Sequence, residues 1–440
     1  MLTILFTPLD YHGHINACHG LADSLAARGH RCVFAIDQAS KGRMKKYGYD
    51  EVYYENAGFP GVPEGENSVV YFINQMKDIF RDSSLVIAKH FQAMGFEGMF
   101  SMLTARKERY QQIIDELQPD VIVVDSYVGC YPLTNSGRPW VWLFSASPLF
   151  AFNNRKLPPP WSGLKVDASD ECQEFWHSIE DMLQNLHNIV KESYESSSAP
   201  VDDNNGVEVE YDWSDICTVH PRSPYLNIYM TPEELDYQEI QPLPENWRRV
   251  DGFVRQTDET FELPDKLLDN RSDSKLVFLS MGSIGCCHIE LMQRLIAIFG
   301  KSRHRFIVAT GPLHDKIVDD LPDNMWGQEF VPQTAILPLV DLVITHCGNN
   351  TVTETFYYGK PMLALPLFGD QFENAQRLVD TGLGLRCHPL IATDDELLSS
   401  VDKLVDDQVL ADKMRLIGER IRQSNDNEVV AKQIEDLIVK

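Results

Sequence analysis

The sequence lacks long apolar runs and any ordered cysteine pattern, and each absence excludes a class of protein. No stretch approaches about 18 uninterrupted apolar residues, so we expect no membrane-spanning helix. The opening MLTILFTPLDYHGH has no basic leader and too short an apolar run to be typical of a signal peptide. The nine cysteines are scattered and include no CxxC pair, which favours reduced thiols in a cytoplasmic protein over a disulfide framework.

Positive charge is also scarce. The chain has 39 Lys and Arg against 65 Asp and Glu, a formal net charge of −26. Such a surface repels nucleic acid and anionic lipid, so neither is expected as a partner. An anionic ligand would have to be held by local dipoles. No G-x-G-x-x-G follows the first strand of either half of the chain, which disfavours a nicotinamide dehydrogenase.

What is present is a repeated alternation of apolar strands and amphipathic helices. LTILF, a helical pattern with Leu21 and Leu25, and HRCVFAI form one βαβ unit near the start. The same alternation restarts at KLVFLSMGS, after a Pro-rich linker at residues 231–252. Near-continuous apolar strands are typical of parallel sheets covered on both faces. The sequence therefore predicts an α/β protein of two doubly wound, Rossmann-like domains, with ligands at the carboxyl ends of strands and in the cleft between domains.

The first expected domain spans residues 1–240 and the second spans residues 241–420. Within the first, residues of about 150–225 look like a variable insertion, and we expect mobility at residues 157–222 because LPPPW, an acidic helical stretch and DDNNG follow one another. The last part of the chain is helical in pattern. We expect residues 421–440 to pack back on the first domain, and the whole protein to be a monomer.

The segment DLVITHCGNNTVTE predicts a strand, a turn and a helix that begins near Thr351. A helix start leaves backbone N–H groups unpaired and carries roughly +0.5 charge, so it suits a phosphate. Ordinary capping by Asn and Thr is the alternative explanation. His346 could donate to an anion there, and Glu354, one turn into the helix, could accept two ribose hydroxyls.

Three further turns carry polar groups at strand ends. Asp370 and Gln371 suit a polyhydroxylated ligand such as a sugar, although a loop Asp capping the next helix explains Asp370 equally simply. The SMGS turn at residues 280–283 offers Gly and hydroxyls. FVPQ, from Phe330, offers an aromatic face and an amide for a nucleobase, or simply a helix start after Pro332.

Near the start, HGHINA follows the first strand and places His12 and His14 at a carboxyl edge. A histidine there is either a buried structural residue or a general base. Asp125 ends the strand VIVVD. If the two strands are neighbours, its carboxylate can reach the imidazole, fix its tautomer and stabilise the imidazolium, as in a catalytic triad without the nucleophile. A capping role for Asp125 is the alternative.

At this point the residues resemble a known family. FVPQ, THCGNNTVTE, YYGKPM and PLFGDQFENA match, in order and spacing, the signature segment of the UDP-glycosyltransferases, the inverting Leloir enzymes of GT-B fold. GHINA followed by LADSLAARGH is similar to the N-terminal GH motif of that family. Two departures stand out: Phe330 lies where Trp is most common, and Asn349 lies where plant members carry Trp.

The resemblance implies a role for each matching residue. Phe330 would stack on uracil, with the Val331 backbone and Gln333 at the edge of the base. Glu354 would bind the ribose, and Asp370 and Gln371 the sugar hydroxyls. The diphosphate would be held by Ser283, His346, Asn350 and Thr351, helped by the backbone of Gly348 and Asn349, and Gly13 would border the donor. His14 would be the base and Asp125 its partner, and no acceptor-binding residue is predicted.

The expected activity is therefore transfer of a hexose, glucose from UDP-glucose above all, to a hydroxyl of a small lipophilic acceptor. Flavonoids, other phenolics and xenobiotics are the acceptor class, and detoxification is the implied role. Inversion at the anomeric carbon, no cofactor and no metal are expected. The first domain would bind the acceptor and the second the UDP-sugar. The alternatives are a UDP-sugar epimerase or hydrolase of similar fold, and a non-catalytic UDP-sugar-binding protein.

Overall fold

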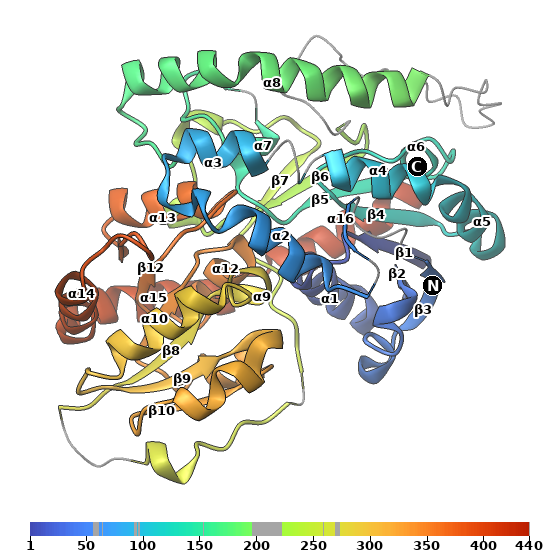
Figure 1. Ribbon diagram of the computed structural model, residues 1–440. Helices are drawn as coiled ribbons and strands as arrows, with labels where there is room; N and C mark the ends of the chain where they lie inside the picture. The colour runs from blue at the N-terminus through green and yellow to red at the C-terminus, as the bar shows by residue number, and fades with distance from the viewer. Residues whose placement is uncertain are drawn as a thin grey trace.

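The computed structural model describes residues 1–55, 61–63, 65–91, 95, 97–152, 154–195, 222–257, 259–268 and 273–439. Two parallel β-sheets, each covered by helices, form two lobes (Figure 1). The fold is therefore the predicted α/β arrangement of two doubly wound, Rossmann-like domains. Their strands are buried along most of their length, which explains the near-continuous apolar runs in the sequence.

The first sheet has seven strands in the order β3-β2-β1-β4-β5-β6-β7, and all neighbours are parallel. Its strands are β1 (Thr3–Pro8), β2 (Arg31–Asp37), β3 (Asp50–Tyr54), β4 (Val121–Asp125), β5 (Trp140–Phe144), β6 (Leu226–Met230) and β7 (Trp247–Val250). The chain order reverses between β1 and β4, the switch point at which ligands bind in open α/β sheets.

The helices that come before the second sheet in sequence are α1 (His12–Ala27), α2 (Ser68–Met76), α3 (Ser84–Phe91), α4 (Glu97–Ala105), α5 (Lys107–Leu117), α6 (Tyr131–Thr134), α7 (Pro148–Ala151) and α8 (Ser169–Glu195). The long α8 runs along the outside of the first lobe, green in Figure 1. It is part of the predicted insertion. Residues 157–163, which precede it, are buried, and the predicted mobile stretch from 196 to 221 lies outside the described residues.

The second sheet has six parallel strands in the order β10-β9-β8-β11-β12-β13. They are β8 (Leu276–Ser280), β9 (Arg305–Ala309), β10 (Met325–Gln328), β11 (Leu342–Thr345), β12 (Met362–Ala364) and β13 (Gly384–Arg386). The helices of this half are α9 (Gly282–Gly285), α10 (Ile289–Phe299), α11 (Gln333–Ile336), α12 (Asn349–Tyr357), α13 (Gln371–Asp380), α14 (Asp394–Asp406), α15 (Gln408–Gln423) and α16 (Asp426–Val439).

The lobes exchange segments, and this changes the domain boundaries drawn from the sequence. The boundary predicted at residue 240 falls inside the first sheet, because β7 pairs with β6 there. Residues 68–87 also reach the second lobe: Ile73, Met76, Phe80 and Ile87 are buried in its core, while α3 packs on α8 of the first lobe through its other side. At the other end of the chain, α16 packs on α1 and β7 of the first lobe. In each exchange, the other lobe buries the apolar face of an amphipathic helix. The helix's own lobe leaves that face uncovered.

Two simpler properties concern cysteines and membranes. The eight cysteines in the described part of the chain are free thiols, and all but Cys387 are buried. Cys217 lies outside the described residues. None of the described helices has both the length and the apolar character needed to cross a membrane.

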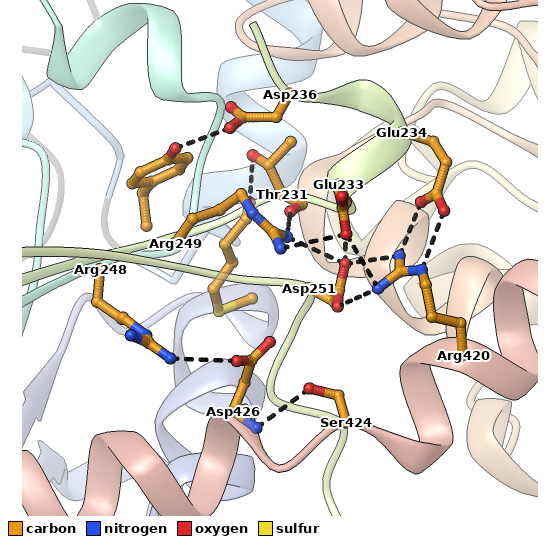
Figure 2. Close-up of polar contacts among 12 residues, drawn as sticks. Thr231, Glu233, Glu234, Asp236, Arg248, Arg249, Asp251, Arg420, Ser424 and Asp426 are labelled. Carbon is orange, nitrogen blue, oxygen red and sulfur yellow. Dashed lines mark hydrogen bonds and ion pairs between the residues drawn. The ribbon is translucent and has the colours of Figure 1, made fainter. Parts of the chain in front are cut away.

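A network of ion pairs links α15 to the chain near the end of the first sheet, where the chain passes from one lobe to the other (Figure 2). Arg420, near the end of α15, donates to both carboxylate oxygens of Glu234 at 3.1 and 2.8 Å, and to both of Asp251 at 3.0 and 2.9 Å. Asp251 directly follows β7 and also accepts from Arg249 at 3.0 Å. Burial alone would raise the pKa of Asp251, but the hydrogen bonds from Arg420 and the charge of Arg249 hold it below its ordinary value. The network joins α15 to the segment that follows β6 and to the residue that follows β7.

Replacement of Arg420 by methionine should lower the free energy of unfolding by about 1–3 kcal/mol, because it leaves the buried Asp251 with one cationic partner where it had two. The matched control is Arg415→Met on the same helix. Arg415 pairs with Glu419 at the surface, so its loss should be within about 0.5 kcal/mol. Urea denaturation followed by circular dichroism measures both variants. Equal midpoints for the two variants would show that the network does not stabilise the junction.

Candidate active site

His14 and Asp125 lie together at the carboxyl edge of the first sheet. Strands β1 and β4 are neighbours, with Pro8 opposite Asp125, and α1 begins four residues after Pro8. The Nδ1 atom of His14 lies 2.9 Å from Oδ1 of Asp125, whose carboxylate is fully buried. A carboxylate beside Nδ1 favours the tautomer with the proton on that nitrogen. The other nitrogen, Nε2, can then accept a proton.

Ser145 is a third member of this group that the sequence analysis missed. Its Oγ lies 3.0 Å from Nδ1 of His14, and its N–H donates to Oδ1 of Asp125 at 3.4 Å. Ser145 directly follows β5, the strand next to β4. The signal was available, since WVWLF at residues 140–144 is an apolar run of strand length, and a serine at its end belongs to the same sheet edge.

Opposite this edge, two helix N-termini meet. Helix α12 begins at Asn349, directly after the end of β11, and packs against α1 near its start. Gly13 in the first turn of α1 faces Asn350 so closely that a Cβ on Gly13 would lie 3.7 Å from the Cβ of Asn350. Thr351 is buried in the first turn of α12. Both helix ends carry unpaired N–H groups and positive dipole ends, so the junction is a strong candidate for binding an anion.

His346 lies in this junction between two glycines. A Cβ on Gly282 would come within 2.4 Å of its ring, and a Cβ on Gly348 within 2.5 Å, so neither position tolerates a larger residue without movement. Ser283 follows Gly282 at the start of α9. Burial lowers the pKa of His346 to about 4, so near neutral pH the ring can donate one hydrogen bond as a neutral group.

The side chain of Asn349 bonds to two groups of the protein itself. Its Nδ2 donates to the carbonyl of Ser145 at 3.0 Å and to the carbonyl of Met230 at 2.8 Å. Both acceptors belong to the first lobe, so the amide bridges the two lobes beside His14 and Asp125. The backbone N–H of Asn349 remains at the start of α12. The Asn found where plant members carry Trp therefore has a structural use in this chain.

Glu354 is almost fully buried and already has partners. Arg255 forms an ion pair with its Oε1, and Asn350 donates to the same oxygen at 3.0 Å. Gln333 donates to Oε2 at 2.7 Å. Gln333 was expected at the edge of a uracil, and here its amide holds Glu354.

The two expected base-binding residues border the same mouth. The Phe330 ring is 56% exposed and lies parallel to the ring of His12, with centroids 5.9 Å apart. Val331 packs against the core of the second lobe. His12 comes from α1, so the aromatic contact crosses between the lobes.

The expected sugar-binding pair lies at the start of α13. Burial raises the pKa of Asp370 to about 6, although the charge of His14 and the N–H groups of Ser147 and Asn349 act in the opposite direction. The Oε1 atom of Gln371 accepts from the backbone N–H groups of Leu367 and Phe368 at 2.9 and 3.2 Å. That amide therefore shapes the loop and keeps only its NH₂ group for a ligand.

Glu373, which the sequence analysis did not single out, also lies here. Its Oε2 accepts from the N–H of Trp161 at 2.7 Å, a contact between lobes. Burial and the nearby Asp370 raise its pKa well above the ordinary value. Its position three residues after Asp370 was the only signal in the sequence.

Comparison with known proteins identifies the family. The family model described as UDP-glucoronosyl and UDP-glucosyl transferase matches residues 228–421. The NDP-glycosyltransferase YjiC of Bacillus subtilis is 22% identical over 432 residues, covering 98% of this chain and 95% of the relative. Over residues 228–421 the chain therefore belongs to the UDP-glycosyltransferase family. The zeaxanthin glucosyltransferase of Pantoea ananas is 24% identical over 422 residues, covering 89% of this chain and 87% of the relative.

The solved structures show the same architecture. The glycotransferase of kitacinnamycin superposes with a TM-score of 0.66 at 19% identity, covering 99% of both chains. The chain therefore has the GT-B fold. The family match and the full-length relative together make it a glycosyltransferase. The family model covers the second-lobe residues from Ser283 to Gln371, whereas His14 and Asp125 lie outside the matched span. The structure brings both sets to the same junction.

Proposed function

We propose that this glycosyltransferase transfers glucose from UDP-glucose to a hydroxyl of a small lipophilic acceptor, with inversion. The observation that carries the proposal is the His14–Asp125 pair, which lies beside two helix N-termini that can bind a diphosphate. A base and an anion site at one junction are what transfer from a sugar nucleotide requires. A binding protein without catalytic activity would need only the anion site.

In the proposed reaction, Nε2 of His14 takes the proton of the acceptor hydroxyl as its oxygen attacks the anomeric carbon. The bond from that carbon to the diphosphate oxygen breaks on the opposite face, and UDP leaves. Asp125 stabilises the imidazolium that forms. The N-termini of α1 and α12, with a hydrogen bond from His346, stabilise the growing charge on UDP, a role that we assign to the chain and not to a metal ion.

Aromatic rings near His14 support a lipophilic acceptor. The Tyr127 ring meets the His14 ring edge-on with centroids 5.5 Å apart, and Tyr127 in turn contacts Phe144 and Phe150. Tyr11 lies on another side of His14 at 6.4 Å. The relative named zeaxanthin glucosyltransferase has an apolar acceptor in its name, which agrees with this proposal. Asp370 and Gln371 support a neutral hexose with free hydroxyls.

The test is a panel of UDP-sugars incubated with a mixture of phenolic acceptors and read by mass spectrometry. The proposal expects an acceptor adduct 162 mass units heavier with UDP-glucose, a mass that is about that of an anhydrohexose. Reactions without acceptor separate the alternatives: release of free glucose indicates a hydrolase, and a new UDP-sugar indicates an epimerase. Binding of UDP-glucose without turnover under any condition would indicate a non-catalytic binder.

The carboxyl of Asp370 should give the reaction a pH dependence. Its pKa is raised to about 6, and only the carboxylate form can accept bonds from two sugar hydroxyls. The kcat/KM for UDP-glucose should therefore rise as pH increases through about 6. In Asp370→Asn the rise of kcat/KM through pH 6 should vanish. The kcat/KM at pH 8 should also fall about 10–100-fold. A rise of kcat/KM near pH 6 that persists in Asp370→Asn would show that another group titrates there.

A further inference from the structure

Arg255 is a buried charged residue to which neither the family resemblance nor the proposed reaction gives a role. It lies in the chain that follows β7 and leads into the second lobe. Its side chain is 11% exposed, and the side chain of its partner Glu354 is 1% exposed. A guanidinium this well buried against a carboxylate is a defined interaction and not a loose surface pair.

The partners of Glu354 decide what its carboxylate can still bind. Each carboxylate oxygen accepts about two hydrogen bonds. Oε1 accepts from Arg255 and Asn350, and Oε2 accepts from Gln333. One acceptor position therefore remains, on Oε2. A ribose presents two neighbouring hydroxyls, and a carboxylate that binds both needs one position on each oxygen.

His12 lies near two cations. Burial and the charges of Arg43 and Arg255 together lower the pKa of His12 to about 4. His12 itself stacks on Phe330, the expected base-binding residue. Arg255 therefore contacts the expected ribose-binding carboxylate and acts electrostatically on His12, the neighbour of the expected base-binding ring, where a positive charge also suits a nucleoside diphosphate.

We propose that Arg255 is a specificity-determining residue that occupies one of the two ribose positions on Glu354, so that the enzyme barely distinguishes ribose from 2′-deoxyribose in the nucleotide. The proposal rests on the proposed function, since it assumes that the nucleotide binds at Glu354. It deepens that function by predicting a donor range that includes deoxyribonucleoside diphosphate sugars.

Isothermal titration of the full chain with UDP and with 2′-deoxy-UDP tests the proposal. The wild type should bind the two nucleotides with Kd values within about threefold of each other. Arg255→Met frees a position on Oε1, and a hydrogen bond from ribose to a buried carboxylate should then favour UDP by about tenfold or more. Arg255→Lys keeps a cation and a donor and should stay close to the wild-type ratio.

The ratio of the two Kd values is the readout, because an unpaired Glu354 could weaken both nucleotides equally. A wild-type ratio of about tenfold or more, or an unchanged ratio in Arg255→Met, overturns the assignment while UDP binding still supports the proposed function. Failure of the wild type to bind either nucleotide overturns both the assignment of Arg255 and the proposed function. Melting curves check the fold, and Arg255→Gln, which removes the charge but keeps a polar side chain, replaces Arg255→Met if the latter does not fold. Arg255→Gln should give a ratio of the two Kd values between that of the wild type and the tenfold or more expected for Arg255→Met. A ratio in Arg255→Gln equal to that of the wild type also counts against the assignment.

Discussion

Replacement of His14 by alanine should reduce the rate of glycosyl transfer by about 10²–10⁴-fold, the usual contribution of a positioned general base. The methyl group of alanine cannot take the acceptor proton, and no described side chain other than Ser145 and Asp125 is shown bonded to the His14 ring nitrogens. The α12 N-terminus and Glu354 remain intact in the variant. Binding of UDP, measured by titration calorimetry, should therefore stay within about threefold of the wild type.

His177→Ala is the control for this experiment. His177 lies on α8, its side chain is 89% exposed, and its substitution should leave both turnover and binding unchanged. Turnover of His14→Ala close to that of the wild type would show that the base is another group. Loss of UDP binding along with turnover would show instead that the substitution disturbs the junction between α1 and α12.

Replacement of Asp125 by asparagine should lower turnover by about 10²–10⁴-fold while the protein stays folded. The amide has nearly the same shape as the carboxylate, but it cannot stabilise an imidazolium, and its NH₂ group can donate to Nδ1 of His14. Donation to Nδ1 would place the proton on Nε2, the nitrogen that must accept one. Steady-state kinetics at saturating UDP-glucose, with a melting curve for each variant, measures the effect.

Asp120→Asn is the matched control for Asp125→Asn. Asp120 comes just before β4, and its Oδ2 accepts from the N–H of Thr3 at 2.7 Å, at the opposite end of the same strand. Its substitution should affect stability and leave turnover close to that of the wild type. If Asp125→Asn keeps near-wild-type turnover, Ser145 becomes the residue that orients His14, and Ser145→Ala should then show the larger loss.

Local patterns in the sequence predicted much of the fold correctly. The alternation of apolar strands and amphipathic helices is repeated in both halves, and it is enough to predict two parallel sheets. The turn after β11 was also readable, since Gly348 and Asn349 mark a helix start wherever they lie in the fold. These features depend on residues close in sequence, so a local pattern contains the information.

The partners of buried polar groups could not be predicted in this way. The amide of Asn349 bonds to carbonyls of Ser145 and Met230, and Glu354 pairs with Arg255, which lies 99 positions earlier in the chain. Nothing near Glu354 in sequence indicates a guanidinium. The expected role of Gln333 at the edge of the base overlooked its bond to Glu354, because a buried polar group takes whatever partner the packed lobes bring to it.

By itself the sequence determined which residues are chemically able to act: a histidine after the first strand, a carboxylate at the end of another, and a helix N-terminus with Asn and Thr. Only the tertiary structure decided that β4 lies beside β1, that β5 adds Ser145, and that α2 packs in the other lobe. The physical reason is that strand order and lobe contacts are settled by burial of apolar faces over the whole chain, whereas helix starts and strand periods are settled within a few residues.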